Sequence, residues 1–378
     1  MGTGHLRSRL LAPLVAFLFV LGLCGYPLLL GRTIYWLDAG FMIFPFWVFT
    51  RSSLSHGVVP LWNPWNAAGV PFLATMSTMT LYPLTFLLLP LPPWASFTFY
   101  AAFHLALGAF FSTSYAMFVG LPPSAALVTG AIYALNGWLL AHLPYPHDCA
   151  GYAWLPAQFW AVEACSRRPV PLMAVLLGMV FALPVLGGFP QYAGISAATS
   201  VIYAFFLLLT NVKRGKALRF LLCILGGTAL GLMLASAQAL PGWELLSLSQ
   251  RKAVPYKHHL ARILPPRHLL LLLVPGFMGW PRLQTYWGAN YHLDGLTYVG
   301  TSSLFLALCG LRAGKDKRRL FFGGLLVAAL AMALGPGTPL HPLIWMLLPP
   351  ARPFLKDPVR FFQLAAWAVA MLAGWGAG

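Results

Sequence analysis

Long apolar runs recur along the whole chain and are separated by short segments that hold the polar and charged residues. A run of roughly 20 apolar residues is long enough to cross the hydrocarbon layer of a bilayer as a helix. The pattern predicts ten such spans, at 11–30, 94–117, 122–142, 152–166, 170–187, 192–210, 218–240, 296–311, 320–335 and 361–378. We therefore predict an all-α fold, a polytopic helix bundle embedded in a membrane.

Two segments between spans are long, and the first of them repeats Pro, Trp and Asn. They are residues 31–93 and 241–295. Their aromatic residues suit the headgroup layer, and we expect re-entrant or interfacial helices there. The stretch 71–91 is placed at the interface, because an eleventh span would change the side of every later loop. No soluble domain is visible, so residues 1–378 are predicted to be one transmembrane domain.

The two ends of the chain carry expectations of their own. The run 11–30 is predicted to be a retained signal-anchor helix, since no small-residue cleavage motif follows it. The final span stops in apolar sequence, which suggests that the chain is the N-terminal part of a longer protein.

Composition agrees with a membrane protein. Charged residues make up 8% of the chain and hydrophobic residues 59%, with a mean hydropathy of +0.75, whereas a soluble domain carries about 25% charged residues. The net charge of +17 would suggest nucleic acid in a soluble protein. Here it follows largely from basic residues on cytoplasmic loops, so we expect no nucleic-acid partner. The five cysteines show no disulfide or metal-type spacing.

The basic residues also orient the chain. We predict a plasma-membrane protein whose N-terminus lies on the cytoplasmic side. In this orientation, just over half of the 24 Lys and Arg residues fall on or beside the short cytoplasmic segments. These segments are 1–10, 118–121, 167–169, 211–217 and 312–319. The orientation places five of the seven acids outside: Asp38, Asp148, Glu244, Asp294 and Asp357.

Asp38 is the first candidate catalytic residue. It follows the first span in "TIYWLDAGFMIFPF", where acids are scarce and aromatic residues surround it. Partial removal from water would make a carboxylate a better base, and a carboxylate at a membrane edge is by default a functional hypothesis. The alternative is an ordinary residue at the end of a helix.

Two further outer clusters could supply a second carboxylate or an acid–base group. They are His147 with Asp148 in "PYPHDCAGY", and His292 with Asp294 in "NYHLDGLTYVG". The first pair could also help to hold a divalent metal ion, although the spacing matches no metal signature. The alternative for both clusters is capping of helix ends. His104 lies in mid-span and is expected to be a neutral interhelical hydrogen-bond donor.

The stretch "SQRKAVPYKHHLAR" gathers basic side chains on the outer side. It contains Arg251, Lys252, Lys257, His258 and Arg262. Arginine binds phosphate bidentately, so the stretch could clamp the phosphate of a lipid substrate. The alternative is a basic surface that binds anionic headgroups.

Several blocks of the sequence together resemble the YfhO family of bacterial membrane proteins. They are "PLWNPWNAAGVPFLA" with "LYPL", "AWLPAQFWAVE", "GGFPQY", "ASAQALPGWELLSLSQR", "YWGANYHLDGLTYVG" and "KDPVRFFQLAAWAVAMLAG". Their order is kept and they cover nearly the whole chain. Where the family often has Glu in the block before "YVG", this chain has Asp294.

The resemblance implies the GT-C fold of lipid-dependent glycosyltransferases. Such enzymes take a sugar from a polyprenyl-phosphate donor on the outer face, and a catalytic acid lies in their first outer loop, where Asp38 stands. The expected acceptor is a cell-envelope polymer or lipid. Two alternatives stay open: a transporter of lipid or polysaccharide, and a non-catalytic envelope assembly factor. Charges at mid-membrane, common in transporters, are nearly absent here.

Overall fold

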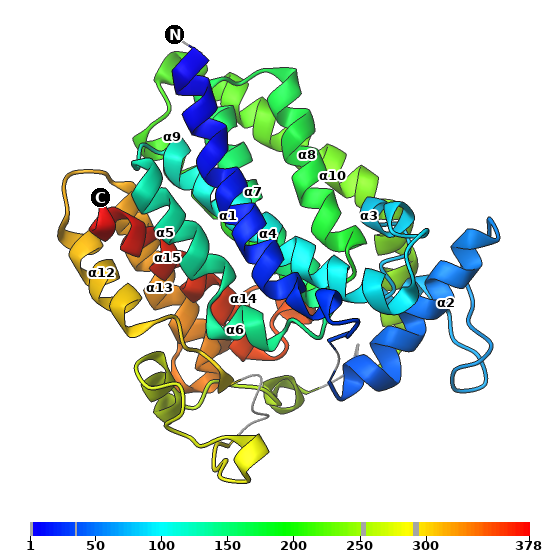
Figure 1. Ribbon diagram of the computed structural model, residues 1–378. Helices are drawn as coiled ribbons and strands as arrows, with labels where there is room; N and C mark the ends of the chain where they lie inside the picture. The colour runs from blue at the N-terminus through cyan, green and yellow to red at the C-terminus, as the bar shows by residue number, and fades with distance from the viewer. Residues whose placement is uncertain (1–2, 35, 251–254, 290–294) are drawn as a thin grey trace. The chain divides into compact units, whose positions relative to one another are not determined.

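The computed structural model describes residues 3–34, 36–250, 255–289 and 295–378, and within these ranges the protein is all-α (Figure 1). One isolated backbone bridge joins Asn63 to Val70, and the described residues form no sheet. The contacts divide the chain into two compact units. The first unit holds residues 1–20, 108–142 and 255–378, and the second unit holds residues 21–107 and 143–254.

The second unit is built mainly from long helices. Its elements are the end of α1 (Thr3–Leu29), η1 (Ala39–Ile43), α2 (Phe44–Ser55), η2 (Leu73–Thr75), α3 (Pro83–Leu87), the start of α4 (Pro93–Phe118), α7 (Pro146–Arg167), α8 (Pro171–Leu186), α9 (Pro190–Thr210) and α10 (Arg214–Leu248). Proline stands in the first turn of α7, α8 and α9, where its missing N–H is not needed.

The first unit combines helices with short 3-10 segments. Its elements are the start of α1, the end of α4, α5 (Pro123–Ala134), α6 (Gly137–Ala141), η4 (Tyr256–Leu260), η5 (Pro266–Leu272), η6 (Pro281–Leu283), α12 (Thr301–Arg312), α13 (Arg318–Ala333), η7 (Gly335–Gly337), α14 (Leu340–Leu347), η8 (Pro349–Phe354), η9 (Pro358–Phe361) and α15 (Phe362–Ala377).

Among the described residues, five helices are long and apolar enough to span a membrane: Leu10–Leu29, Pro93–Phe118, Pro190–Thr210, Arg214–Leu248 and Pro358–Ala377. They indicate a multi-pass membrane protein. A helix lies at each of the ten predicted spans, but several are shorter than expected, and residues 122–142 are divided between α5 and α6. Residues 241–248, predicted to begin an outer loop, continue α10 instead. The count of ten spans stays a prediction.

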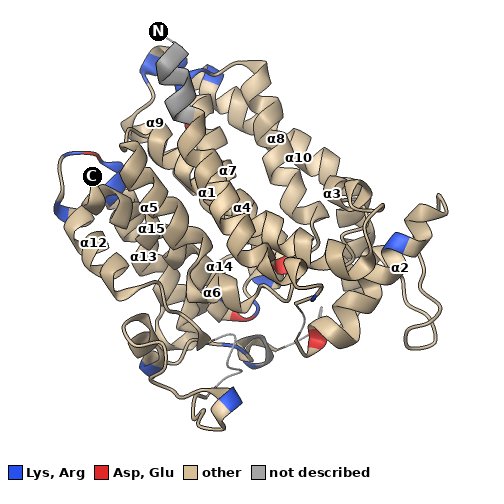
Figure 2. Ribbon diagram, in the orientation of Figure 1, with Lys and Arg blue, Asp and Glu red and all other residues tan. Residues whose placement is uncertain are grey.

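Charged residues lie mostly at helix ends and in connecting segments, and the helices are uncharged along most of their length (Figure 2). In the second unit, the Lys216 ammonium donates to the backbone oxygen of Arg167 at 3.2 Å. This bond joins the basic turn after α7 to the basic turn before α10. The two turns, both predicted to be cytoplasmic, therefore lie at the same end of this unit.

Small residues allow close helix packing in both units. In the second unit, a Cβ placed on Gly227 of α10 would lie 2.9 Å from the backbone oxygen of Ala174 in α8. In the first unit, a Cβ on Gly310 of α12 would overlap the backbone oxygen of Leu372 in α15. Helices in membranes pack through such small residues because apolar side chains gain little by leaving lipid.

The 71–91 segment is not a span, because it forms only the short η2 and α3 with turns between them. One of its residues, Tyr82, nevertheless contacts His104 in the middle of α4. The buried Tyr82 hydroxyl lies 2.8 Å from Nε2 of His104, and the Trp154 indole N–H donates to the same hydroxyl at 3.1 Å. Nδ1 of His104 lies 2.7 Å from the Tyr100 carbonyl and must donate to it. His104 is thus an acceptor from Tyr82, and the predicted donation to another helix is wrong.

Candidate functional site

The segment before Asp38 is attached to the start of α4 by threonine side chains. The hydroxyls of Thr33 and Thr98 lie 2.9 Å apart, and the backbone N–H of Ile34 donates to the Thr98 hydroxyl at 3.1 Å. Thr33 also donates to the backbone oxygen of Trp94 at 3.2 Å. These contacts lie within the second unit and fix where the chain leaves α1.

Asp38 stands at an unusual backbone junction. Leu37 has a φ of +43°, a left-handed conformation that is strained for a leucine. Directly after Asp38 the chain forms the π-helix η1, which then continues as α2. Non-glycine residues in left-handed conformations cost about 1–3 kcal/mol and cluster at functional sites, and π-helical turns are also frequent there.

The Asp38 side chain is exposed and makes no capping hydrogen bond to η1. The partial removal from water predicted for it is wrong, because the Asp38 side chain is itself exposed, as are Trp36 and Phe41. The alternative role of a helix cap finds no hydrogen bond to support it. The carboxylate is therefore accessible and is not used to close the helix.

An open pocket of about 310 Å³ lies beside Asp38 and is lined by Trp36, Leu37, Gly40 and Phe41. Its walls are thus the residues on either side of the acid. An apolar and aromatic pocket next to an accessible carboxylate could receive the apolar face of a sugar or part of a lipid.

The start of α7 lies close to the Asp38 segment. The Tyr145 hydroxyl is 3.5 Å from the backbone oxygen of Trp36, two residues before the acid. His147 and Asp148 follow in the first turn of α7, and both are buried. His147 Nε2 lies 3.4 Å from Asp148 Oδ1, and the His147 ring packs on Phe189. The structure thus brings two of the predicted clusters into one region of the second unit, with Asp38 exposed and the His147–Asp148 pair buried.

Capping explains the His147–Asp148 pair only in part. Asp148 lies in the first turn of α7, where a negative charge interacts favourably with the helix dipole, but the N-cap residue of that helix is Tyr145. A buried carboxylate needs a partner of opposite charge or hydrogen bonds, and His147 is close enough to serve as one.

A buried cation stabilises a neighbouring part of the second unit. Arg51 of α2 is 7% exposed and donates to the carbonyls of Leu88, Leu89 and Leu91, which follow α3. Its guanidinium also lies 5.7 Å from the Trp47 ring centroid. The role of Arg51 as a carbonyl clamp depends on long-range contacts that no local sequence pattern reveals.

The predicted phosphate clamp belongs to the first unit. Lys257 is exposed on η4, and Arg262 is half-buried. The segment is held at both ends: the Tyr256 hydroxyl lies 3.0 Å from Nδ1 of His341, and the Arg262 carbonyl accepts from Val359 N–H at 3.0 Å. Arg251, Lys252, His292 and Asp294 lie outside the described residues, as does the side chain of His258.

Arg262 has a cationic neighbour that sequence analysis did not single out. The Val359 contact brings the chain next to Arg360, whose guanidinium lies 3.4 Å from the buried Asp357 carboxylate. Arg262 and Arg360 also lie within electrostatic range of the buried His142. Two arginines from separate elements therefore approach one place in the first unit.

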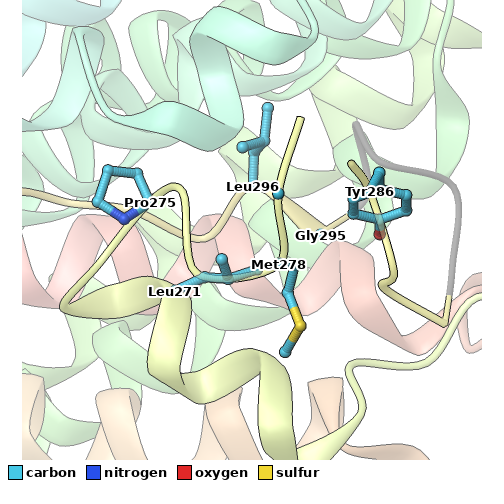
Figure 3. Close-up of a pocket in the computed structure, with 7 residues that line it drawn as sticks. Leu271, Pro275, Met278, Tyr286, Gly295 and Leu296 are labelled. Atoms are coloured by element: carbon cyan, nitrogen blue, oxygen red, sulfur yellow. The ribbon is translucent and has the colours of Figure 1, made fainter. Parts of the chain in front are cut away.

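A second pocket lies in the first unit and is lined by Leu271, Pro275, Met278, Gly279, Tyr286, Gly295 and Leu296 (Figure 3). These residues include no carboxylate, imidazole or cationic group, and the Tyr286 phenol is the one ionisable side chain among them. The metal option gains no support either. Across the described ranges, no three His, Cys, Asp or Glu side chains come together as metal ligands would.

Comparison with known proteins adds no assignment: no family model matches the chain, and no curated protein matches it significantly.

Proposed function

We propose that this chain is an integral-membrane glycosyltransferase of the GT-C type, related to the YfhO family. It would transfer a sugar from a polyprenyl-phosphate donor to a cell-envelope polymer or lipid on the extracytoplasmic face. The observation that carries the proposal is the setting of Asp38: an accessible carboxylate at a strained junction, beside an open pocket, in the first long loop after a membrane-length helix.

In the proposed reaction, the Asp38 carboxylate takes the proton of the acceptor hydroxyl while the hydroxyl oxygen attacks the anomeric carbon. The bond from that carbon to the donor phosphate breaks, and polyprenyl phosphate leaves with the electron pair. A positioned general base contributes roughly 10²–10⁴-fold in rate. His147 and Asp148, which are buried near the Asp38 segment, would act as positioning residues for that segment.

The donor phosphate would be held by arginine side chains of the first unit, with Arg262 and Arg360 as the described candidates. Guanidinium groups from two separate elements suit a phosphate better than a single cation, because each can donate two hydrogen bonds. Asp38 belongs to the second unit and these arginines to the first, so the phosphate contact is a proposal separate from the one made for Asp38.

The test uses purified protein in liposomes with a panel of polyprenyl-phosphate sugars, and it measures consumption of each donor. Asp38→Asn keeps the size of the side chain but removes the base, so we expect turnover per folded molecule to fall about 10²-fold or more while donor binding is kept. Glu244→Gln is the matched control, since it removes another exposed carboxylate of the same unit.

Full turnover in Asp38→Asn would remove the catalytic assignment. Movement of intact donor lipid between leaflets by the wild-type protein, without release of polyprenyl phosphate, would instead identify a transporter.

A further inference from the structure

The loop that follows α2 exposes an unusual group of apolar side chains. Trp65 is 86% exposed, Leu61 64%, Val58 57% and Trp62 56%. In addition, no Asp, Glu, Lys or Arg occurs anywhere from residue 52 to residue 147. Exposed apolar side chains gathered in one loop mark a site of interaction, and without charges this loop offers nothing to an ionic partner.

The loop is a fixed structure. Asn63 and Val70 exchange two backbone hydrogen bonds of 2.9 Å, and Phe72 N–H donates to the Leu61 carbonyl at 2.8 Å. The Asn63 side-chain oxygen accepts from Trp65 N–H at 3.0 Å, which shapes the tip. Gly69, with a φ of +112°, lies directly against the Trp62 indole, where a Cβ would come within 2.5 Å of the ring. The two tryptophans are therefore presented by a hairpin that backbone hydrogen bonds close.

The position of the hairpin along the membrane normal can be worked out from its contact with helix α10. The base of the loop, through Met76 after η2, packs against Gly242 of α10, where any Cβ would overlap the Met76 sulfur. Gly242 lies 26 positions along the helix from Lys216 in the basic turn, which corresponds to about 39 Å at about 1.5 Å per residue. All these residues belong to the second unit.

That length matches the thickness of a bilayer. The hydrocarbon core is about 30 Å thick and the headgroup layers bring the total to about 40–45 Å. Since the basic turn cannot enter the hydrocarbon, Gly242 lies in the headgroup layer of the opposite leaflet. We infer that the 58–70 hairpin docks into this headgroup layer, with Trp62 and Trp65 as its anchors. Tryptophan favours that layer because its indole has an apolar body and a polar N–H.

The inference does not depend on the proposed function. It does have a consequence for the second unit, because α2 directly joins the hairpin to η1 and Asp38. An anchored hairpin would hold that segment at a constant depth relative to the lipid headgroups.

The experiment places a nitroxide label on Ala67→Cys at the tip of the hairpin. The full chain is reconstituted in phosphatidylethanolamine and phosphatidylglycerol vesicles, and the collision rates of the label with oxygen and with a water-soluble nickel chelate are compared. The native cysteines are buried or half-buried, and the chain without the added cysteine measures any labelling of them. The matched control carries the same label together with Trp62→Ser and Trp65→Ser.

We expect the label in the parent chain to collide several-fold more with oxygen, relative to the chelate, than the label in the double variant. Equal access to the chelate in both chains would overturn the inference and place the hairpin in water. Protection of such a water-exposed label by added oligosaccharide would also overturn it, and would assign the tryptophans to glycan binding.

Discussion

The Tyr82 hydroxyl is the centre of a buried hydrogen-bond chain, and its removal gives a sharp test of the second unit. It donates to Nε2 of His104 and accepts from the Trp154 indole. Tyr82→Phe would remove this partner from the buried His104 ring and from the half-buried Trp154 indole. Each unsatisfied buried group costs about 1–3 kcal/mol, although hydrogen bonds between membrane helices average only about 0.6 kcal/mol. We expect a loss of about 2 kcal/mol in the free energy of unfolding.

Tyr100 supplies a matched control in the same cluster. Its ring centroid lies 5.5 Å from that of Tyr82, and its hydroxyl is buried without a hydrogen-bond partner among the described residues. Tyr100→Phe removes the same atom but leaves nothing unpaired, so we expect it to be neutral or to stabilise the fold by up to about 1 kcal/mol.

Unfolding of both variants would be measured in mixed lipid–SDS micelles by tryptophan fluorescence. Nitrogen NMR of His104 gives a second readout, and it should find the proton on Nδ1 in the wild type. Equal losses in the two variants, or a proton on Nε2, would refute the described chain of bonds.

Three further predictions concern packing, pH and topology. Gly227→Ala should destabilise the fold by about 1–3 kcal/mol because its Cβ meets Ala174, whereas Gly226→Ala, which meets nothing, should stabilise α10 by up to about 1 kcal/mol in the same unfolding assay. Burial, and then the charge of Arg267, lowers the pKa of His268. The unfolded chain therefore binds this proton more readily, so stability should fall as the pH drops below about 6.5, and His268→Gln should reduce that fall in a denaturant titration. A cysteine at Lys315 should resist an impermeant thiol reagent added to intact cells, and labelling from outside would contradict the cytoplasmic assignment.

Apolar periodicity was a good guide to the helices, because a bilayer requires long apolar segments with internally satisfied backbones. The starts of α8 and α9 fall within two residues of their predicted positions, since Pro171 and Pro190 mark them. The break between α5 and α6 was missed. There Asn136 caps a new helix through its side chain, which accepts from Leu139 N–H, and the surrounding apolar run concealed that signal.

Sequence could identify Asp38 as a candidate because acids are rare in the chain. It could not foresee the exposure of that side chain, the left-handed Leu37 or the contact with Tyr145, because these depend on packing between distant segments. The same reason explains why Arg360 was not grouped with Arg262, which precedes it by 98 positions in the printed sequence.

The burial of α15 has a consequence for the time course of synthesis. This helix is almost completely enclosed in the first unit, where it packs against α5, α12 and α13. The ribosome completes α5 more than two hundred residues before it reaches α15, an interval on the order of ten seconds or longer at usual elongation rates. During that interval α5 can pair with α4, where Gly130 meets Thr113, but its main partner does not yet exist. All residues of the second unit are made before α15 begins, so a nascent chain stalled near residue 360 should contain a protease-resistant second unit and an incomplete first unit.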